Sequence, residues 1–282
     1  MRVLVTGAAG MLGRRVLADA AARGWDAVGI DLPDADLTDA AAASAIVARH
    51  APDAIVHCAA WVDVDGAEER EADALRVNES GSRNVGQAAA QAGARVVAVS
   101  TDYVFDGTLT GRPYVESDPV APLGAYGRTK LAGEVALAAE VDDHAIARTA
   151  WLFGWPGKSF PDTMLRAAET RDRVAVVTDQ VGSPTWTGHL SPALLDLAAS
   201  DVRGPVHTAG GGQCSWHELT VELYRQAGVA CAVDETTSAD FVRPAERPAW
   251  SVMATERAAA GAPVLPAWQD GVAGYLIERN KT

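Results

Sequence analysis

The chain has 282 residues, and its 24 Lys and Arg residues against 37 Asp and Glu residues give a formal charge of −13 at pH 7. So acidic a chain repels polyanions, which argues against nucleic acid and anionic membrane surfaces as partners. With 48% hydrophobic and 22% charged residues, it has the composition of a globular protein with one large domain or two unequal ones. It contains no run of about 18 apolar residues, so we expect no membrane span.

Short β-branched runs alternate with alanine-rich stretches through the first half of the chain. This alternation predicts parallel βαβ units with helices on both faces of a sheet, which is a doubly wound α/β fold. The expected strands are residues 2–6, 25–31, 54–58, 95–100 and 144–149. The expected helices are residues 10–23, 40–50, 73–92 and 121–140.

Beyond residue 150 this alternation loosens. Two segments, residues 173–178 and 204–208, still have the composition of strands, and we expect them to extend the first sheet. We therefore assign residues 1–150 and 173–212 to a dinucleotide-binding domain. The remaining residues, 151–172 and 213–282, hold five of the eight tryptophans and are expected to form a smaller, discontinuous substrate-binding lobe.

A glycine-rich loop follows the first expected strand, with Gly7, Gly10 and Gly13 three residues apart. Such glycines let the backbone approach a pyrophosphate, and the helix that follows offers free N–H groups. Asp31 ends the next strand, where a carboxylate can accept the adenosine ribose hydroxyls. Each feature alone has a simpler interpretation as a tight turn, but together they predict a bound dinucleotide. Both NADH and NADPH stay open, because the basic residues at positions 14 and 15 could meet a 2′-phosphate that Asp31 would repel.

Tyr126 and Lys130 are four residues apart on an expected helix, so both project from one face. A nearby ammonium group favours the phenolate and would lower the tyrosine pKa from about 10 toward neutral pH. Thr101, at the end of an expected strand, could bond a substrate carbonyl that Tyr126 protonates as hydride arrives. Lys130 could also hold the nicotinamide ribose. The alternative is chance spacing on an exposed helix and a hydroxyl that caps a turn; the three residues together favour catalysis.

Cysteine usage and the first residues of the chain bear on the compartment. Cys58, Cys214 and Cys231 are odd in number and lack metal-ligand spacing, so we expect no metal site and a reduced, cytoplasmic protein. The segment MRVLVTGAAG enters a strand and turn without the pattern of a signal peptide. Trp216 and Trp268 lie in apolar helical patterns and are expected in the core. A homodimer is the assembly we consider.

Several motifs resemble those of extended short-chain dehydrogenases/reductases that act on nucleotide sugars. These motifs are the glycine loop, His57-Cys58-Ala59-Ala60, Asn78-x-x-Gly81-x-x-Asn84 and Tyr126-x-x-x-Lys130. Within that superfamily, a further set is similar to the dTDP-4-dehydrorhamnose reductase family: STDYVFDG from Ser100, PLGAYGRTK from Pro122, RTAW from Arg148, DQVGSPT from Asp179, Arg247-Pro248 and LPAW from Leu265. The resemblance runs nearly end to end.

The resemblance implies reduction of the 4-keto group of dTDP-4-dehydro-6-deoxy-L-mannose to dTDP-L-rhamnose. Together with the loop and the Tyr–Lys pair, it gives these expected cofactor contacts: Gly7, Gly10, Met11, Leu12, Gly13, Asp31, Asp36, Leu37, Ala60, Trp61, Val62, Tyr126 and Lys130. It also places Thr101, Asp102 and Trp151 at the sugar. Arg247 is a candidate for the substrate diphosphate, because a guanidinium fork suits phosphate, and its alternative is a salt bridge to Glu246 or another neighbour.

Two alternatives to this function remain. Trp61 and Val62 replace smaller or more polar residues common in that family, which favours a 4-ketoreductase of another nucleotide deoxysugar in antibiotic biosynthesis. A non-catalytic NADP-binding regulatory subunit is the alternative from a different class. That second alternative predicts a degraded Tyr–Lys pair, whereas here the pair is intact.

Overall fold

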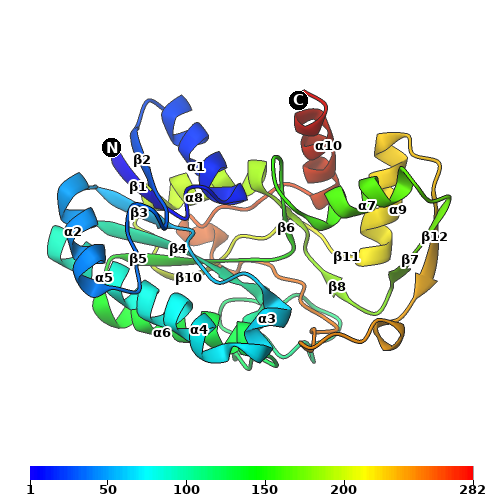
Figure 1. Ribbon diagram of the computed structural model, residues 1–282, viewed down its shortest axis with the longest axis horizontal. Helices are drawn as coiled ribbons and strands as arrows, with labels where there is room; N and C mark the ends of the chain where they lie inside the picture. Colours follow the sequence, from blue (N-terminus) through cyan, green and yellow to red (C-terminus); the bar gives the residue numbers. More distant parts are fainter. Residues whose placement is uncertain (282) are drawn as a thin grey trace.

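The alternating apolar runs form a six-stranded parallel sheet in a computed structural model that describes residues 1–281 (Figure 1). Its strand order is β10-β5-β4-β3-β1-β2. The strands are β1 (Arg2–Thr6), β2 (Asp26–Ile30), β3 (Ala54–His57), β4 (Arg95–Thr101), β5 (His144–Thr149) and β10 (Gly204–His207). This is the doubly wound α/β fold expected from the sequence.

The strand order reverses between β1 and β3. At the end of β1, Thr6 pairs with Ile30 of β2 on one side and with His57 of β3 on the other. The chain therefore leaves β1 in one direction and, after β2, returns in the opposite direction. In open parallel sheets the crevice at the carboxyl ends of such strands is where ligands bind.

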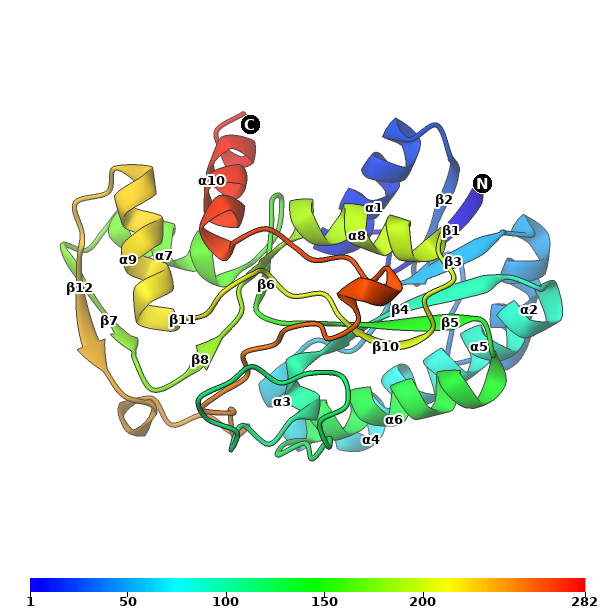
Figure 2. The ribbon, with the colours of Figure 1, turned by 180° about the vertical axis from the view of Figure 1, so that it is seen from behind.

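Two helical layers cover the sheet (Figure 2). Val3 and Val5 of β1 pack with α1 (Met11–Ala22) and α8 (Thr187–Ala198). Leu4 between them packs on the opposite face, because successive side chains of a strand point to opposite sides. The helices of that face are α2 (Ala40–His50), α5 (Gly81–Ala92) and α6 (Ala125–Glu140). Between β3 and α5 lie the short helices α3 (Val64–Glu69) and α4 (Glu71–Leu75) and a π-helical turn, Arg76–Ser80.

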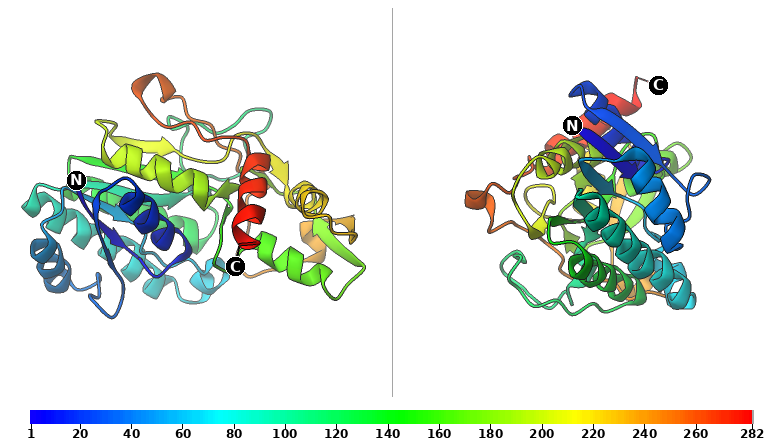
Figure 3. Two further views of the ribbon diagram at one scale, coloured as in Figure 1. Left: turned by 90° about the horizontal axis from the view of Figure 1, so that it is seen from above. Right: turned by 90° about the vertical axis from the view of Figure 1, so that its left-hand side faces the viewer.

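A smaller lobe lies to one side of the sheet (Figure 3). It has a core of its own, built from aromatic and aliphatic side chains of α7, α9, α10 and β7. Its helices are α7 (Phe160–Ala168), α9 (Trp216–Ala227) and α10 (Trp268–Arg279), and its parallel strand pair is β7 (Arg173–Val177) with β12 (Ala232–Thr236). Short strand pairs join it to the sheet: β6 (Leu152–Phe153) with β9 (Thr185–Trp186), and β8 (Val181–Gly182) with β11 (Cys214–Ser215).

One of the two late strands lies where the sequence predicts it. The strand at residues 204–207 pairs with β5 and extends the main sheet. The expectation for residues 173–178 is wrong, because this strand pairs only with β12 in the smaller lobe. Val174 and Val176 are buried while alternate residues are exposed, which suits a strand with one covered face. The division of the chain into two domains stays a prediction, and Thr282 lies outside the described residues.

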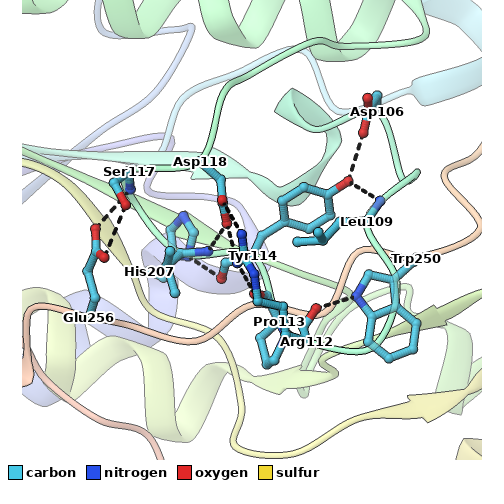
Figure 4. A network of polar contacts seen from close by, with 11 residues as sticks. Asp106, Leu109, Arg112, Pro113, Tyr114, Ser117, Asp118, His207, Trp250 and Glu256 are labelled. Carbon is cyan, nitrogen blue, oxygen red and sulfur yellow. Dashed lines mark hydrogen bonds and ion pairs between the residues drawn. The ribbon is translucent and has the colours of Figure 1, made fainter.

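A polar network ties the loop after β4 to the segment around residue 250 (Figure 4). The Tyr114 hydroxyl donates to Asp106 Oδ1 at 2.7 Å, and the indole of Trp250 donates to the Arg112 carbonyl at 3.1 Å. His207 at the end of β10 contacts the Tyr114 carbonyl through Nδ1 at 3.2 Å. The network thereby fixes the loop that connects β4 to α6. No helix among residues 1–281 is long and apolar enough to cross a membrane.

A buried ion pair joins α6 to β5. Arg148 donates to Glu134 through Nη2 at 2.7 Å and through Nε at 3.0 Å, and each side chain is only 5% exposed. Ser100 of β4 donates a further hydrogen bond to Glu134. The carboxylate therefore binds both central strands from the helix side.

We predict that Glu134→Ala lowers the free energy of unfolding by about 3–5 kcal/mol, because it leaves the Arg148 guanidinium buried without a partner. Urea unfolding of the purified variant and of the original protein measures the change. Glu69→Ala, an exposed residue of α3, is the matched control and should change stability by less than about 0.5 kcal/mol. Equal losses in the two variants would contradict a structural role for the pair.

Candidate active site

The glycine loop packs closely against the end of β3. Gly7 has a φ of +64°, and a Cβ there would lie 2.7 Å from the Ala59 nitrogen. A Cβ on Gly13 would lie 2.2 Å from the Gly7 carbonyl oxygen, so neither position accommodates a side chain. Helix α1 begins at Met11 without a side-chain cap, which leaves its first N–H groups for an anion. The loop therefore fits the pyrophosphate of a dinucleotide.

A cavity of about 410 Å³ opens at the carboxyl ends of β1, β2 and β3. Asp31, Asp36, Leu37, Ala60 and Val62 line it, as do Gly7 and Gly10. Its size and position suit the adenosine half of a dinucleotide.

Trp61 is not among the residues that line this cavity. Its indole Nε1 donates to the Asp63 carbonyl at 2.8 Å, and the Arg70 guanidinium lies 4.9 Å from the ring centroid. The backbone nitrogen of Trp61 donates to Asn78 Oδ1 at 2.8 Å. The residue thus holds the loop after β3 through these contacts, and its expected cofactor contact stays a prediction.

A second cavity, of about 520 Å³, continues from the first, since both are lined by Gly7, Gly10, Cys58, Ala60 and Val62. Met11, Leu12 and Gly13 also line it. At its far side the sequence-predicted catalytic and sugar-binding residues come together: Thr101, Asp102, Tyr126, Lys130 and Trp151. Three separate segments supply them, which are β4 with the turn after it, α6, and the segment after β5.

Tyr126 lies on the first turn of α6 with its ring edge-on to that of Tyr103, at a centroid distance of 5.5 Å. Burial raises the pKa of Tyr126 to about 12, and a hydrogen bond with Thr101 acts in the opposite direction. The expected lowering of this pKa by Lys130 is therefore not what the structure has, because loss of hydration of the phenolate dominates. The phenol stays protonated at neutral pH and can act as an acid.

Lys130 is held one helical turn further along α6. Its Nζ donates to the Val99 carbonyl at 2.8 Å. Burial lowers the pKa of Lys130 to about 8, while the Glu134 carboxylate raises it. The ammonium group therefore still predominates at neutral pH, next to the region where a nicotinamide ribose would lie.

Thr101 and Asp102 end β4 and begin a single 3₁₀ turn, Asp102–Val104. The Thr101 hydroxyl donates to Asp102 Oδ1 at 3.0 Å and accepts from the Tyr103 nitrogen at 3.2 Å. Burial raises the pKa of Asp102 to about 6, and hydrogen bonds with Ser251 and Thr101 oppose that shift. These contacts hold both side chains at the cavity wall.

His57 lies between the glycine loop and α5 and lines the first cavity. Its Nδ1 lies 2.7 Å from the Thr6 hydroxyl, and its Nε2 lies 3.3 Å from the Ser82 hydroxyl. Burial lowers the pKa of His57 to about 3, with a smaller contribution from the charge of Lys130. The ring is therefore neutral throughout the ordinary pH range.

Trp216 is a site residue that sequence reasoning missed. Its indole stacks on that of Trp151 with centroids 3.5 Å apart and planes 3° from parallel. Both rings line the second cavity, and Trp216 also lines a neighbouring cavity of about 370 Å³. Trp216 packs against the core of the smaller lobe, as expected, but it is only partly buried and also borders both cavities. The apolar helical sequence pattern around Trp216 does not indicate a contact between α9 and the segment after β5.

Arg247 lines that neighbouring cavity together with Tyr103 and Arg243. Its guanidinium is paired with Asp65 of α3, with Nη1–Oδ1 at 2.9 Å and Nη2–Oδ2 at 3.0 Å. The structure thus has the salt bridge considered as the alternative for Arg247. A contact to a substrate diphosphate stays a prediction.

The comparison with known sequences covers nearly the whole chain. The protein family described as "RmlD substrate binding domain" matches residues 1–280. A dTDP-4-dehydrorhamnose reductase of Mycobacterium tuberculosis (strain ATCC 25618 / H37Rv) is 43% identical over an alignment of 282 positions, which covers 98% of this chain and 92% of that protein. A dTDP-4-keto-6-deoxy-D-glucose reductase of Streptomyces niveus is 41% identical over 89% of this chain and 88% of its own length.

The fold is also shared with solved structures. A crystal structure of dTDP-4-dehydrorhamnose reductase from Bacillus anthracis str. Ames, in complex with NADP, matches with a TM-score of 0.95 and 33% identity. The match covers 98% of this chain and 99% of that one. The corresponding protein of Clostridium acetobutylicum matches with a TM-score of 0.94, at 36% identity and 98% coverage of both chains.

We predict that His57→Asn flattens the pH dependence of stability. The folded protein keeps His57 neutral down to about pH 3, whereas the unfolded chain binds a proton near pH 6.5. Acid therefore favours the unfolded state, and the stability contributed by a neutral His57 is lost as the pH falls below 6.5. Between pH 7.5 and 5.5 the original protein should lose about 1.4 kcal/mol relative to the variant in urea unfolding. Parallel pH profiles would contradict this assignment.

Proposed function

Since the chain belongs to the dTDP-4-dehydrorhamnose reductase family, we propose that it reduces the 4-keto group of dTDP-4-dehydrorhamnose to give dTDP-L-rhamnose. It is an NAD(P)-dependent oxidoreductase of that family. The observation that carries the proposal is the convergence of Thr101, Tyr126 and Lys130 on a cavity that is continuous with the glycine loop. Carbonyl reduction needs an acid at the oxygen and a dinucleotide at the carbon, and this cleft accommodates both.

The dinucleotide would be held along the two joined cavities. The N-terminus of α1, at Met11 and Leu12, would bind the pyrophosphate, and Asp31 the adenosine ribose. Lys130 would hold the nicotinamide ribose from α6. When bound in reduced form, the nicotinamide supplies the hydride that reaches C4 of the sugar.

Tyr126 acts as the acid. As negative charge develops on the O4 oxygen, the phenol donates its proton to it. This transfer is favourable because an alkoxide is a far stronger base than the phenolate of Tyr126, whose phenol has a pKa of about 12. A hydrogen bond with Thr101 stabilises the phenolate that is left and so lowers the cost of that transfer. The Thr101 hydroxyl is also placed to hydrogen-bond the O4 oxygen of the sugar and fix its position.

The sugar nucleotide would approach from the smaller lobe. Trp151 and Asp102 would contact the sugar, and the stacked Trp151–Trp216 pair would cover it with an apolar surface. The neighbouring cavity, with Arg243 and Arg247 in its lining, would take the nucleoside diphosphate. Arg247 would then exchange at least part of its pairing with Asp65 for phosphate oxygens.

Another 4-keto sugar nucleotide is the second candidate substrate. The Streptomyces niveus relative is named as a dTDP-4-keto-6-deoxy-D-glucose reductase, and this similarity supports a second candidate substrate. A panel of 4-keto dTDP-sugars, each offered with NADH and with NADPH, separates the two. Failure of dTDP-4-dehydrorhamnose to oxidise either cofactor would refute the first proposal. Tight dinucleotide binding without oxidation of the cofactor on any sugar would favour a regulatory subunit instead.

A homodimer and a cytoplasmic location stay predictions from the sequence.

We predict that Tyr126→Phe lowers kcat by about 10²- to 10⁴-fold, the usual contribution of a positioned acid. The dissociation constant for the cofactor should stay within twofold, because the ring that packs beside Tyr103 is retained. Steady-state kinetics and fluorescence titration measure the two effects.

The matched control for this variant is Tyr224→Phe, whose hydroxyl binds the Met164 carbonyl within the smaller lobe. It removes the same atom outside the cleft and should keep kcat near that of the original protein. Unchanged turnover in Tyr126→Phe would remove Tyr126 from the role of acid.

A further inference from the structure

The adenosine cavity carries charge of only one sign. Of the described residues that line it, two are charged, Asp31 and Asp36, and none is a lysine or an arginine. The segment from β2 to α2 reads DLPDADLTD, with no basic residue between Asp31 and Asp39. Any charged group placed at this end of the cleft therefore meets carboxylates first.

Asp31 is fixed in place opposite the glycine loop. Its Oδ2 accepts from the Ala9 nitrogen and its Oδ1 from the Leu32 nitrogen, each at 2.8 Å. Its own nitrogen donates to Asp34 Oδ2 at 3.0 Å. Each carboxylate oxygen of Asp31 keeps capacity for one more donor, which the two hydroxyls of a ribose supply. A phosphate ester on one of those hydroxyls removes a donor and adds about two negative charges.

Two arginines of α1 have partners outside this end of the cleft, and a third arginine lies at its rim. Arg14 donates to the Pro156 carbonyl at 3.0 Å. Arg15 pairs with Asp19 at 2.8 Å and with Glu278 at 2.9 Å. Arg76 is exposed and lies at the rim of the cavity, with Nη1 3.5 Å from the hydroxyl of the lining residue Thr38 and its charge next to that of Asp36. The two arginines whose positions left NADPH open in the sequence thus face away from the ribose.

We propose that this protein binds NADH in preference to NADPH. The inference rests on the proposed function, since it presupposes a nicotinamide dinucleotide in this cleft. The Bacillus anthracis relative was crystallised with NADP, so the family fold admits the 2′-phosphate. The preference here comes from residues of this chain: a fixed carboxylate at the ribose, further acids beside it and no guanidinium among the described residues that line the cavity.

Equilibrium binding tests the proposal without turnover. We expect isothermal titration calorimetry to give at least tenfold tighter binding of ADP-ribose than of 2′-phospho-ADP-ribose, and the same order for NADH and NADPH by fluorescence. The difference should shrink as ionic strength rises, because salt screens the repulsion. Equal or tighter binding of the 2′-phosphate forms would overturn the preference and leave the proposed reduction standing. Binding of neither dinucleotide would overturn both.

Two variants assign the preference to its residues. Leu32 is 72% exposed and lines the cavity, so Leu32→Arg adds a guanidinium there without disturbing the core. Asp31→Asn removes the charge at constant size. Each should shift the ratio of the two affinities toward the 2′-phosphate form by about tenfold or more. Asp201→Asn makes the same charge change at an exposed position before β10, at the opposite edge of the sheet, and should leave the ratio unchanged. Equal shifts in all three variants would refute a local cause.

Discussion

The buried pair of Glu134 with Arg148 sets the position of the whole catalytic helix. Tyr126, Lys130 and Glu134 are spaced four residues apart and lie along one face of α6. Glu134 is anchored to β5 through Arg148 and to β4 through Ser100, so the rotation of the helix about its axis is fixed at its buried end. The other two side chains of that face then point to the end of β4, where Thr101 lies. The hydrogen bonds of Tyr126 with Thr101 and of Lys130 with the Val99 carbonyl then complete the attachment of this face to β4.

Glycines that allow backbone segments to pack closely are the second constraint on the shape of the cleft. Gly133 lets α6 lie against the π-helical turn, where a Cβ would come within 2.4 Å of the Asn78 carbonyl oxygen. Gly7 does the same for the loop after β1 and the end of β3. At Gly7 this close approach lies at the end of β1, beside the point where the strand order reverses, so the backbone borders the crevice without an intervening side chain.

Local signals in the sequence predict most of the fold and many of the residues that line the two joined cavities. Periodicity places the first five strands, and the spacing of Gly7, Gly10 and Gly13 identifies the loop, because each depends on neighbours in the chain. Contacts between distant segments left no such signal. The stacking of Trp216 on Trp151, the pairing of Arg247 with Asp65 and the partnership of β7 with β12 each join residues at least 58 positions apart. The pKa of Tyr126 also escaped prediction, since burial outweighs the lysine that the sequence brings near it.

The late arrival of α8 and β10 along the chain has a consequence for synthesis. Leu190, Leu194 and Leu197 of α8 cover the same sheet face as α1, and β10 closes the edge beside β5. A ribosome that has made only the first 150 residues has therefore produced five strands with half of one apolar face bare and an unpaired edge. Such a fragment exposes the surfaces through which strands aggregate. The sheet can be completed only after about residue 207 has emerged, which makes the order of the elements a constraint on how this protein is made as well as on what it binds.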